Sequence, residues 1–223
     1  MLVYLVKYVV ITASIVAFMA PFLLWYLWQT ARERPRTINL LLEEFFTSRQ
    51  ANWLVFSWAA AEAVVWFVIP EFLLLLVIFM RIRHKRHMLL YDVGGTAVGT
   101  IAAFIIRLPE HAVAQLPYIQ DRMIAQTRVW YDQSGVLGLA NQPFSGVPYK
   151  VFTHLAWEYQ YNFVLFIVVA VVVRMLRYVV AYGLFISLYP KLHKVVERNY
   201  LPLAAAAIAI FSVLLLRTVN VYR

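Results

Sequence analysis

The sequence predicts an all-α integral membrane protein folded as one helical bundle, and composition, segment length and continuity support this class. Hydrophobic residues make up 63% of the 223 residues and charged residues 14%, whereas soluble domains average about 45–50% apolar and about 25% charged. A membrane-spanning helix needs roughly 20 mainly apolar residues. Four segments meet this requirement: 3–28, 88–107, 163–188 and 201–217. No linker rich in Ser, Gly or Pro divides the chain, so we expect a single membrane domain over residues 1–223.

The first expected element is an N-terminal membrane helix within residues 1–30. Its apolar stretch is longer than the roughly 7–15 residues of a secretory signal core and has no basic leader, which predicts an uncleaved helix. Residues 31–50 follow, in which leucine and phenylalanine alternate with glutamate and arginine at helical spacing. This pattern is typical of an amphipathic helix that lies at the membrane interface.

Residues 51–80 contain the pair Pro70-Glu71 and fit either one long kinked span or a hairpin that enters and leaves on the same side. The flanking charges discriminate between these two interpretations. Arginines precede the segment within 31–50, and the run RIRHKRH follows it at 81–87. Because basic loops stay in the cytoplasm, we predict a re-entrant hairpin, which keeps both basic clusters on one face.

The remaining elements complete two units of hairpin plus helix. Helix 88–107 is expected to cross outward, and 108–140 to form an external loop with a short helix. Residues 141–162 would then dip in from outside as a second hairpin, before helix 163–188 returns to the cytoplasm. The two hairpins have opposite orientations, as in inverted-repeat transporters, whose sites form where broken helices meet. The C-terminal helix 201–217 completes the bundle.

The basic loops also predict the orientation of the chain and its class of partner. The net charge is +9 and is concentrated between apolar segments, which fits anionic lipid headgroups rather than nucleic acid. We therefore expect a cytoplasmic location for three loops: 31–50, 81–87 and 191–198.

The second hairpin contains the stretch PFSGVPYKVF, residues 143–152. Gly146 permits unusual dihedral angles, and Pro148 breaks a helix. Unpaired N–H groups beside such a break can hold an anion, to which Lys150 would add a positive charge. The alternative is an ordinary interfacial loop whose lysine reaches the headgroups.

Four ionisable residues lie within apolar segments: Glu62, Glu71, Arg174 and Arg177. Each charge costs roughly 2.5–3.5 kcal/mol on an insertion scale. Arg174 and Arg177 are three positions apart and so share a helix face. Two interpretations stay open. Either glutamate and arginine form structural ion pairs, or they line a polar path in which a glutamate binds a proton and the arginines bind an anionic headgroup.

Several other features limit the chemistry of the chain. Gly95 and Gly99 form a small-xxx-small face suited to close helix packing. Cysteine is absent, which excludes disulfides and thiolate metal sites. The sequence has no metal-ligand cluster, phosphate loop or G-x-S-x-G motif. We therefore expect no catalytic residue, no metal and no cofactor, and we do not expect an enzyme.

Two regions together resemble a known family. In the first, Glu62, Pro70 and Glu71 precede a glycine-rich helix; in the second, PFSGVPYKVF, with Pro148 and Tyr149 at its turn, precedes the paired arginines. This pattern resembles the DedA superfamily, also called the VTT-domain or SNARE-associated Golgi protein family, and within it the YqaA-like branch. The likeness covers roughly residues 55–190, and we take 51–190 as the corresponding core.

The chain departs from the family pattern at both turns. The first turn has the single proline Pro70, where the family often has several. Many family members carry arginines around the proline of the second turn. Here Ser145 and Gly146 precede Pro148, and the nearest cation is Lys150. Lys150 and the paired arginines would therefore take over the role of the missing arginines.

The resemblance implies two facing re-entrant hairpins and movement of phospholipid or polyprenyl phosphate across a bacterial inner membrane, coupled to protons. We accordingly expect a lipid translocase in which Lys150, Arg174 and Arg177 bind the anionic headgroup and Glu62 or Glu71 carries the proton. The alternative is a non-transporting structural or accessory subunit, with a second copy or another membrane protein as partner. A membrane enzyme acting on lipid phosphates lacks a visible nucleophile–base pair.

Overall fold

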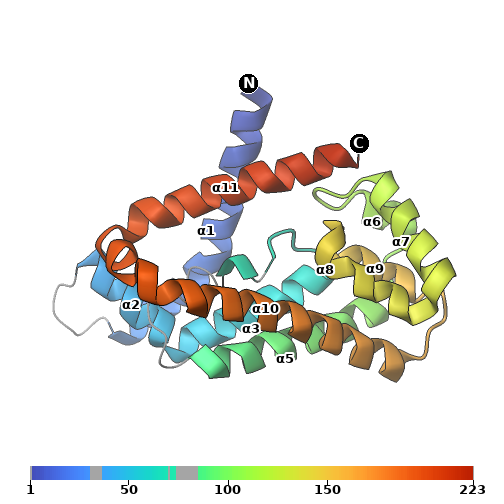
Figure 1. The fold of residues 1–223 in the computed structure, drawn as a ribbon, viewed down its shortest axis with the longest axis horizontal. Coiled ribbons are helices and arrows are strands. Elements are labelled where there is room, and N and C mark those ends of the chain that lie inside the picture. The colour runs from blue at the N-terminus through green and yellow to red at the C-terminus, as the bar shows by residue number, and fades with distance from the viewer. Residues whose placement is uncertain (1, 31–36, 70, 74–84, 223) are drawn as a thin grey trace.

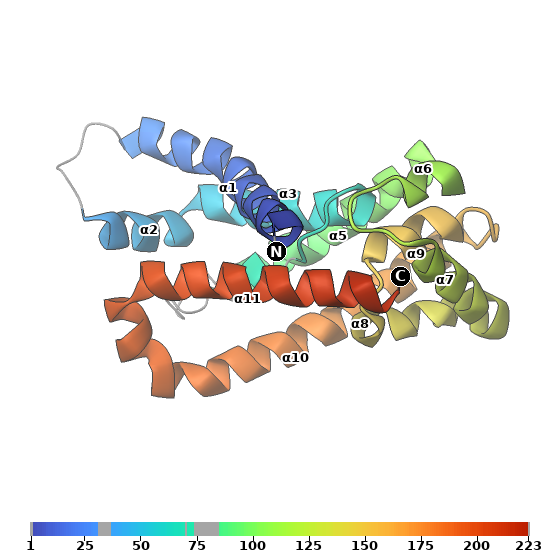
Figure 2. The same ribbon diagram turned by 90° about the horizontal axis from the view of Figure 1, so that it is seen from above.

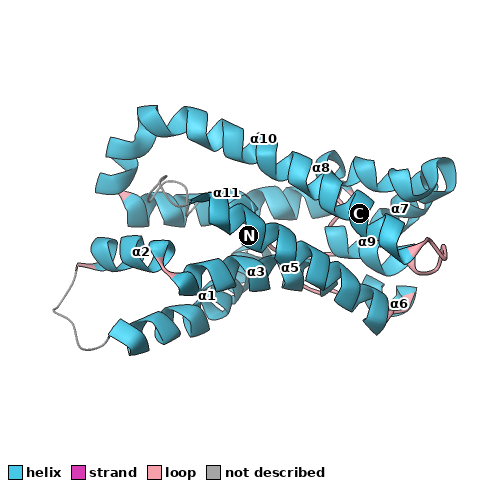
Figure 3. Ribbon diagram, turned by 90° about the horizontal axis from the view of Figure 1, so that it is seen from below, coloured by secondary structure: helices cyan, strands magenta, loops and turns pink. Residues whose placement is uncertain are grey.

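The structure is a computed structural model that describes residues 2–30, 37–69, 71–73 and 85–222, and this part of the chain is helical without a strand (Figures 1 and 3). In chain order the elements are α1 (Leu2–Thr30), α2 (Ile38–Thr47), α3 (Arg49–Val64), α5 (Lys85–Ile106), α6 (Glu110–Ala114), α7 (Asp121–Ser134), the 3₁₀ helix η1 (Gly135–Asn141), α8 (Gln142–Ser145), α9 (Tyr149–Ala156), α10 (Phe163–Arg198) and α11 (Tyr200–Val221). The predicted all-α class is confirmed for the described residues.

Four of these helices are long and apolar enough to cross a membrane. The apolar stretches are Val9–Thr30, His87–Ile106, Phe163–Val196 and Tyr200–Val221, and they fall on the four predicted spans. Large aliphatic side chains cover their outer faces, including Leu24 on α1 and Val172 on α10, each about 60% exposed. A surface this apolar is unfavourable in water, so the fold is compatible with the predicted integral membrane protein.

Within the predicted interfacial helix 31–50, the structure forms the shorter helix α2, Ile38–Thr47. Residues 31–36 lie outside the described part, and α2 ends at Thr47 because Ser48 adopts an extended conformation. The Ser48 hydroxyl accepts a hydrogen bond from the Ala51 N–H and so caps α3, as serine commonly does. Phe45 and Phe46 of α2 are buried in the core.

Helices α3 and α5 lie side by side with their backbones in contact (Figure 3). A methyl group added to Gly95 would overlap the carbonyl oxygen of Phe56, and one added to Gly99 would lie 2.8 Å from the Ala63 Cβ. No side chain fits at either glycine. The predicted close-packing role of the Gly95 and Gly99 face is therefore confirmed.

Residues 108–140 contain more structure than the predicted loop with one short helix. They form α6, α7 and η1, because one face of α7 is apolar and packs on α9 through residues such as Tyr131. Arg128 of α7 pairs with Glu110 and Glu158. The hydrogen bond that Arg128 donates to the Glu110 carboxylate raises the pKa of the Arg128 guanidinium above its ordinary value.

Candidate functional site

The first helix break of the site follows α3. This helix ends at Val64, residues 65–69 are not helical, and helical structure begins again at Glu71. The Trp58 indole N–H donates to the Val68 carbonyl at 2.8 Å and holds the break against the core. Pro70 and most of the predicted second arm of the hairpin, residues 74–80 of 72–80, lie outside the described residues. Re-entry of this segment stays a prediction, as does the cytoplasmic position of loop 81–87.

The second break lies between α8 and α9, within the predicted turn. Gly146 has φ +74° and ψ 0°, the left-handed conformation that favours glycine. A Cβ at this position would also lie 2.6 Å from the Thr218 methyl group of α11. Pro148 then occupies the N-cap position of α9, directly before Tyr149. Both the backbone conformation and the proximity of α11 therefore require glycine at 146.

Three side chains of α9 bind the open end of α3. The Lys150 Nζ donates to the carbonyl oxygens of Val65 at 2.9 Å and Pro117 at 3.2 Å. Thr153 donates to the Ala63 carbonyl at 2.7 Å, and His154 Nε2 lies 2.9 Å from the Val64 carbonyl. The last carbonyls of a helix lack intrahelical partners, and a cation there is favourable. Lys150, predicted to bind a headgroup, is thus placed as a cap that joins the two breaks.

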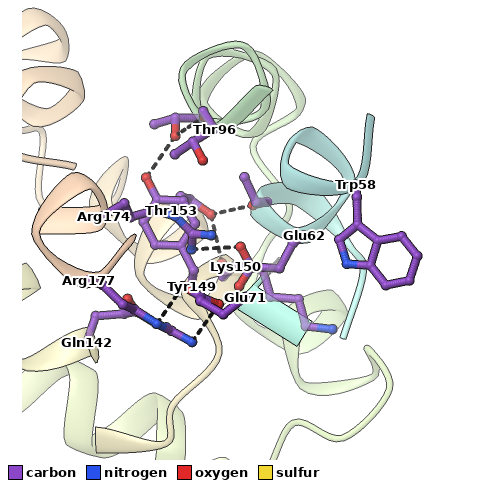
Figure 4. Close-up of polar contacts among 12 residues, drawn as sticks. Trp58, Glu62, Glu71, Thr96, Gln142, Tyr149, Lys150, Thr153, Arg174 and Arg177 are labelled. Carbon is purple, nitrogen blue, oxygen red and sulfur yellow. Dashed lines mark hydrogen bonds and ion pairs between the residues drawn. The ribbon is translucent and has the colours of Figure 1, made fainter. Parts of the chain in front are cut away.

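Two ion pairs connect α10 to both sides of the first break (Figure 4). Arg174 Nη1 lies 2.7 Å from Glu62 Oε2, and both side chains are almost fully buried. Arg177 Nε lies 2.7 Å from Glu71 Oε1, and Nη2 donates to Oε2 at 3.0 Å. Glu62 precedes the break and Glu71 follows it. The sequence left two interpretations open, structural ion pairs or a polar path. The structure shows the ion pairs.

A shell of hydroxyl groups surrounds Arg174, and sequence reasoning missed most of it. The Tyr178 hydroxyl accepts hydrogen bonds from Arg174 Nε and Nη2, at 3.1 and 2.6 Å, and lies 3.4 Å from Thr96 Oγ1. The Tyr149 ring lies 4.6 Å from the Arg174 guanidinium, and its hydroxyl lies 2.8 Å from Thr100 Oγ1. The signal for this shell was present, since threonines spaced by four residues on an apolar span share a helix face.

Asp92 is a second residue that the sequence interpretation did not single out as functional. Its side chain is fully buried, one helical turn before Thr96 on the same face of α5. Neither carboxyl oxygen has a hydrogen-bond partner among the described residues. Burying an ionised carboxylate without a partner is costly, and Asp92 lies close enough to Arg174 and Tyr178 to interact with both electrostatically.

A cavity of about 210 Å³ lies between the two breaks and α11. Its polar lining residues include Glu62, Gln142 and Arg177, and the turn Gly146–Pro148 also lines it. Its apolar lining residues include Phe67, Ile69, Phe211, Leu214 and Leu215. Of the predicted site residues, Glu62, Arg177, Gly146 and Pro148 therefore share one cavity, whereas Lys150 and Arg174 do not line it.

Helix α11 positions this cavity. It returns along α10 and ends beside α8 (Figure 2), where the Tyr222 hydroxyl donates to the Ser145 carbonyl at 2.6 Å. Arg177 is partly accessible from the cavity side, with 16% of its side chain exposed. Among the described residues its Nη1 has no hydrogen-bond partner. One guanidinium edge thus faces Glu71 while the other nitrogen remains able to bind a ligand.

Comparison of the chain with protein-family models, with curated proteins and with solved structures gives no match. The resemblance to the DedA superfamily therefore stays a prediction, and the geometry carries the functional argument.

Proposed function

We propose that the protein is a membrane lipid translocase that holds an anionic phosphate headgroup in the cavity between its two helix breaks. The observation that carries this proposal is Arg177, a partly accessible guanidinium that lines a cavity together with both polar and apolar side chains. Transporters form their substrate sites where broken helices meet in the membrane. Two oppositely inserted re-entrant hairpins are part of the proposal.

The size of the cavity indicates which part of a lipid it would hold. Pockets for whole drug-sized ligands measure about 300–1,000 Å³, and the present cavity measures about 210 Å³. It suits a phosphate headgroup, with the acyl or polyprenyl chains outside against the lipid. Phospholipid and polyprenyl phosphate share this headgroup chemistry, and the DedA-like pattern implies the same substrates.

The predicted headgroup residues divide into two roles. Arg177 would contact the phosphate, because planar guanidinium groups bind phosphate oxygens in pairs. Arg174 and Lys150 are fully buried and occupied by protein groups, so they would position the site. Gln142 lines the same cavity, and among the described residues its Oε1 has no hydrogen-bond partner. Because this oxygen accepts hydrogen bonds, it would contact a hydroxyl group of the headgroup and not the phosphate.

Proton coupling would act through Glu71. This carboxylate and a lipid phosphate compete for the same guanidinium, because Glu71 already holds two nitrogens of Arg177. A proton on Glu71 would weaken this pair and release Arg177 to the headgroup. Binding of proton and of lipid would then favour each other, as reciprocal coupling requires. A bacterial inner membrane, with basic loops in the cytoplasm, completes the proposal.

Reconstitution tests the translocase directly. Purified protein in liposomes should carry fluorescent phosphatidylglycerol or polyprenyl phosphate between leaflets, measured by the fraction of label that an external quencher reaches. Arg177→Gln should abolish this movement, and Arg198→Gln, an exposed arginine on the same helix, should leave it intact. Wild-type protein that moves neither lipid, with or without a pH gradient, would overturn the proposal.

A structural or accessory subunit is the second candidate function. Both arginines already have partners within the chain, which a purely structural role would require. In that case neither wild type nor Arg177→Gln would move lipid faster than liposomes without protein. Stable co-purification with a second membrane protein, lost on disruption of the exposed face of α1 or α10, would support this function.

A further inference from the structure

A second hollow lies away from the ion pairs, where α5 ends and α10 begins. It measures about 480 Å³ and is formed by Phe104, Ile105, Arg107, Trp157, Gln160, Tyr161 and Phe163. Two membrane spans have their ends here, at Ile106 and Phe163. The hollow therefore lies at the level where a bilayer changes from acyl chains to headgroups.

The backbone around this hollow is strained at two positions. Arg107 has φ +52° and Gln160 has φ +51°, and they are two of only three described non-glycine residues with positive φ. Such conformations are unfavourable for side chains larger than glycine and tend to persist at functional sites. Both strained residues line the same hollow, although 53 positions separate them in the sequence.

The charge in the hollow belongs to Arg107. Its guanidinium carbon lies 4.7 Å from the centre of the Trp157 ring, and its Nε donates to the Phe104 carbonyl at 3.2 Å. Among the described residues neither terminal nitrogen of Arg107 has a hydrogen-bond partner. The indole and the carbonyl thus fix the plane of the guanidinium and leave its outer edge able to bind two oxygens of a phosphate.

The walls below Arg107 are apolar. Ile105 is 73% exposed and Phe163 41% exposed, and both lie on spans that face the hydrocarbon. A cation above exposed apolar side chains is complementary to an anionic lipid, which has a negative headgroup above its chains. Trp157 and Tyr161 at the rim are residues typical of the membrane interface.

We propose that this hollow is a binding site for an anionic phospholipid, with its phosphate on Arg107 and its acyl chains against Ile105 and Phe163. The site does not depend on the proposed translocation, since it requires only that α5 and α10 cross the membrane. It also lies on a different part of the chain from the cavity at Arg177.

Native mass spectrometry of the whole protein in detergent tests this site by counting bound lipids. Wild-type protein should bind phosphatidylglycerol more tightly than phosphatidylcholine. Arg107→Gln should weaken phosphatidylglycerol binding about tenfold, the loss of one charge-assisted contact, and remove the preference. Arg122→Gln, an exposed arginine on α7, is the matched control. Unchanged phosphatidylglycerol binding in Arg107→Gln would overturn the proposal.

Two further measurements identify the ligand and guard against a folding defect. Phosphatidylglycerol with brominated acyl chains should quench tryptophan fluorescence of the wild type, and Trp157→Phe should remove part of that quenching while melting at the same temperature. Water-soluble glycerol phosphate should not displace the lipid, because it lacks the chains that the apolar wall holds. Equal quenching in Trp157→Phe and wild type, or displacement by glycerol phosphate, would contradict the lipid site.

Discussion

Arg177 of α10 contacts both carboxylate oxygens of Glu71, at 2.7 and 3.0 Å. One turn earlier, Arg174 holds Glu62 on the other side of the same helix break. A single helix face thus ties together two chain segments that the break separates. This arrangement gives a structural role to two arginines that lie three positions apart in the apolar part of α10.

Removing one partner of the buried pair Glu62–Arg174 should be far more destabilising than removing both. Arg174→Leu leaves an uncompensated buried carboxylate, so the free energy of unfolding should fall by about 3–5 kcal/mol. The double variant Glu62→Leu, Arg174→Leu should recover much of this loss, because no charge remains unpaired. Unfolding in detergent mixtures measures both values. A double variant less stable than Arg174→Leu would show that the pair itself contributes the stability.

Glu71→Gln should separate lipid movement from proton coupling. Glutamine cannot ionise, so Arg177 would remain available to the headgroup at every pH. We expect lipid movement in liposomes to continue but to lose its acceleration by a pH gradient. Glu110→Gln, in the exposed cluster around Arg128, is the control. A Glu71→Gln variant with full gradient dependence would remove Glu71 from the coupling step.

Lys150→Met should destabilise the junction of the two breaks. The substitution keeps the apolar stem but leaves the carbonyls of Val65 and Pro117 without their donor, a loss of about 1–3 kcal/mol. Lys191→Met, at an exposed position on α10, should have no effect. If Lys150→Met has the melting temperature of wild type but loses lipid binding, Lys150 is a headgroup ligand and not a cap.

Gly146→Ala tests the second turn. The left-handed backbone costs an alanine roughly 1 kcal/mol or more, and the added methyl group would meet Thr218. Thr218→Ser removes the opposing methyl, so the double variant should recover the steric part of the loss. Gly183→Ala, with open space around its Cβ position, should be neutral or stabilising. Equal melting temperatures for the two alanine variants would contradict the turn geometry.

Gly95→Ala should separate α3 from α5. The methyl group would overlap the Phe56 carbonyl, and overpacking of this kind costs roughly 1–3 kcal/mol. Its neighbour Gly94 offers a matched control, because a methyl there would meet only the Phe56 ring at 3.6 Å. The thermal stabilities of the two variants in detergent should therefore differ, and identical values would exclude the close contact.

Much of the fold could be predicted because its determinants are local. The four spans follow from runs of apolar residues, and the second break follows from Gly146 and Pro148, whose backbone limits hold in any context. The glycine face of α5 follows from helical spacing alone. The extent of structure in 108–140 could not be predicted this way, because α7 is polar overall and its one apolar face is stabilised by packing on α9.

The sequence by itself determined which residues are chemically unusual: Glu62, Glu71, Lys150, Arg174 and Arg177 are charges in apolar surroundings. Only the tertiary structure decided the partner of each charge. Lys150 binds a carbonyl 85 positions away and Arg177 a carboxylate 106 positions away. Charge and periodicity are properties of a segment, whereas the partner of a buried charge depends on which distant segment packs against it. For that reason the sequence could not separate the cap at Lys150 from the accessible guanidinium at Arg177.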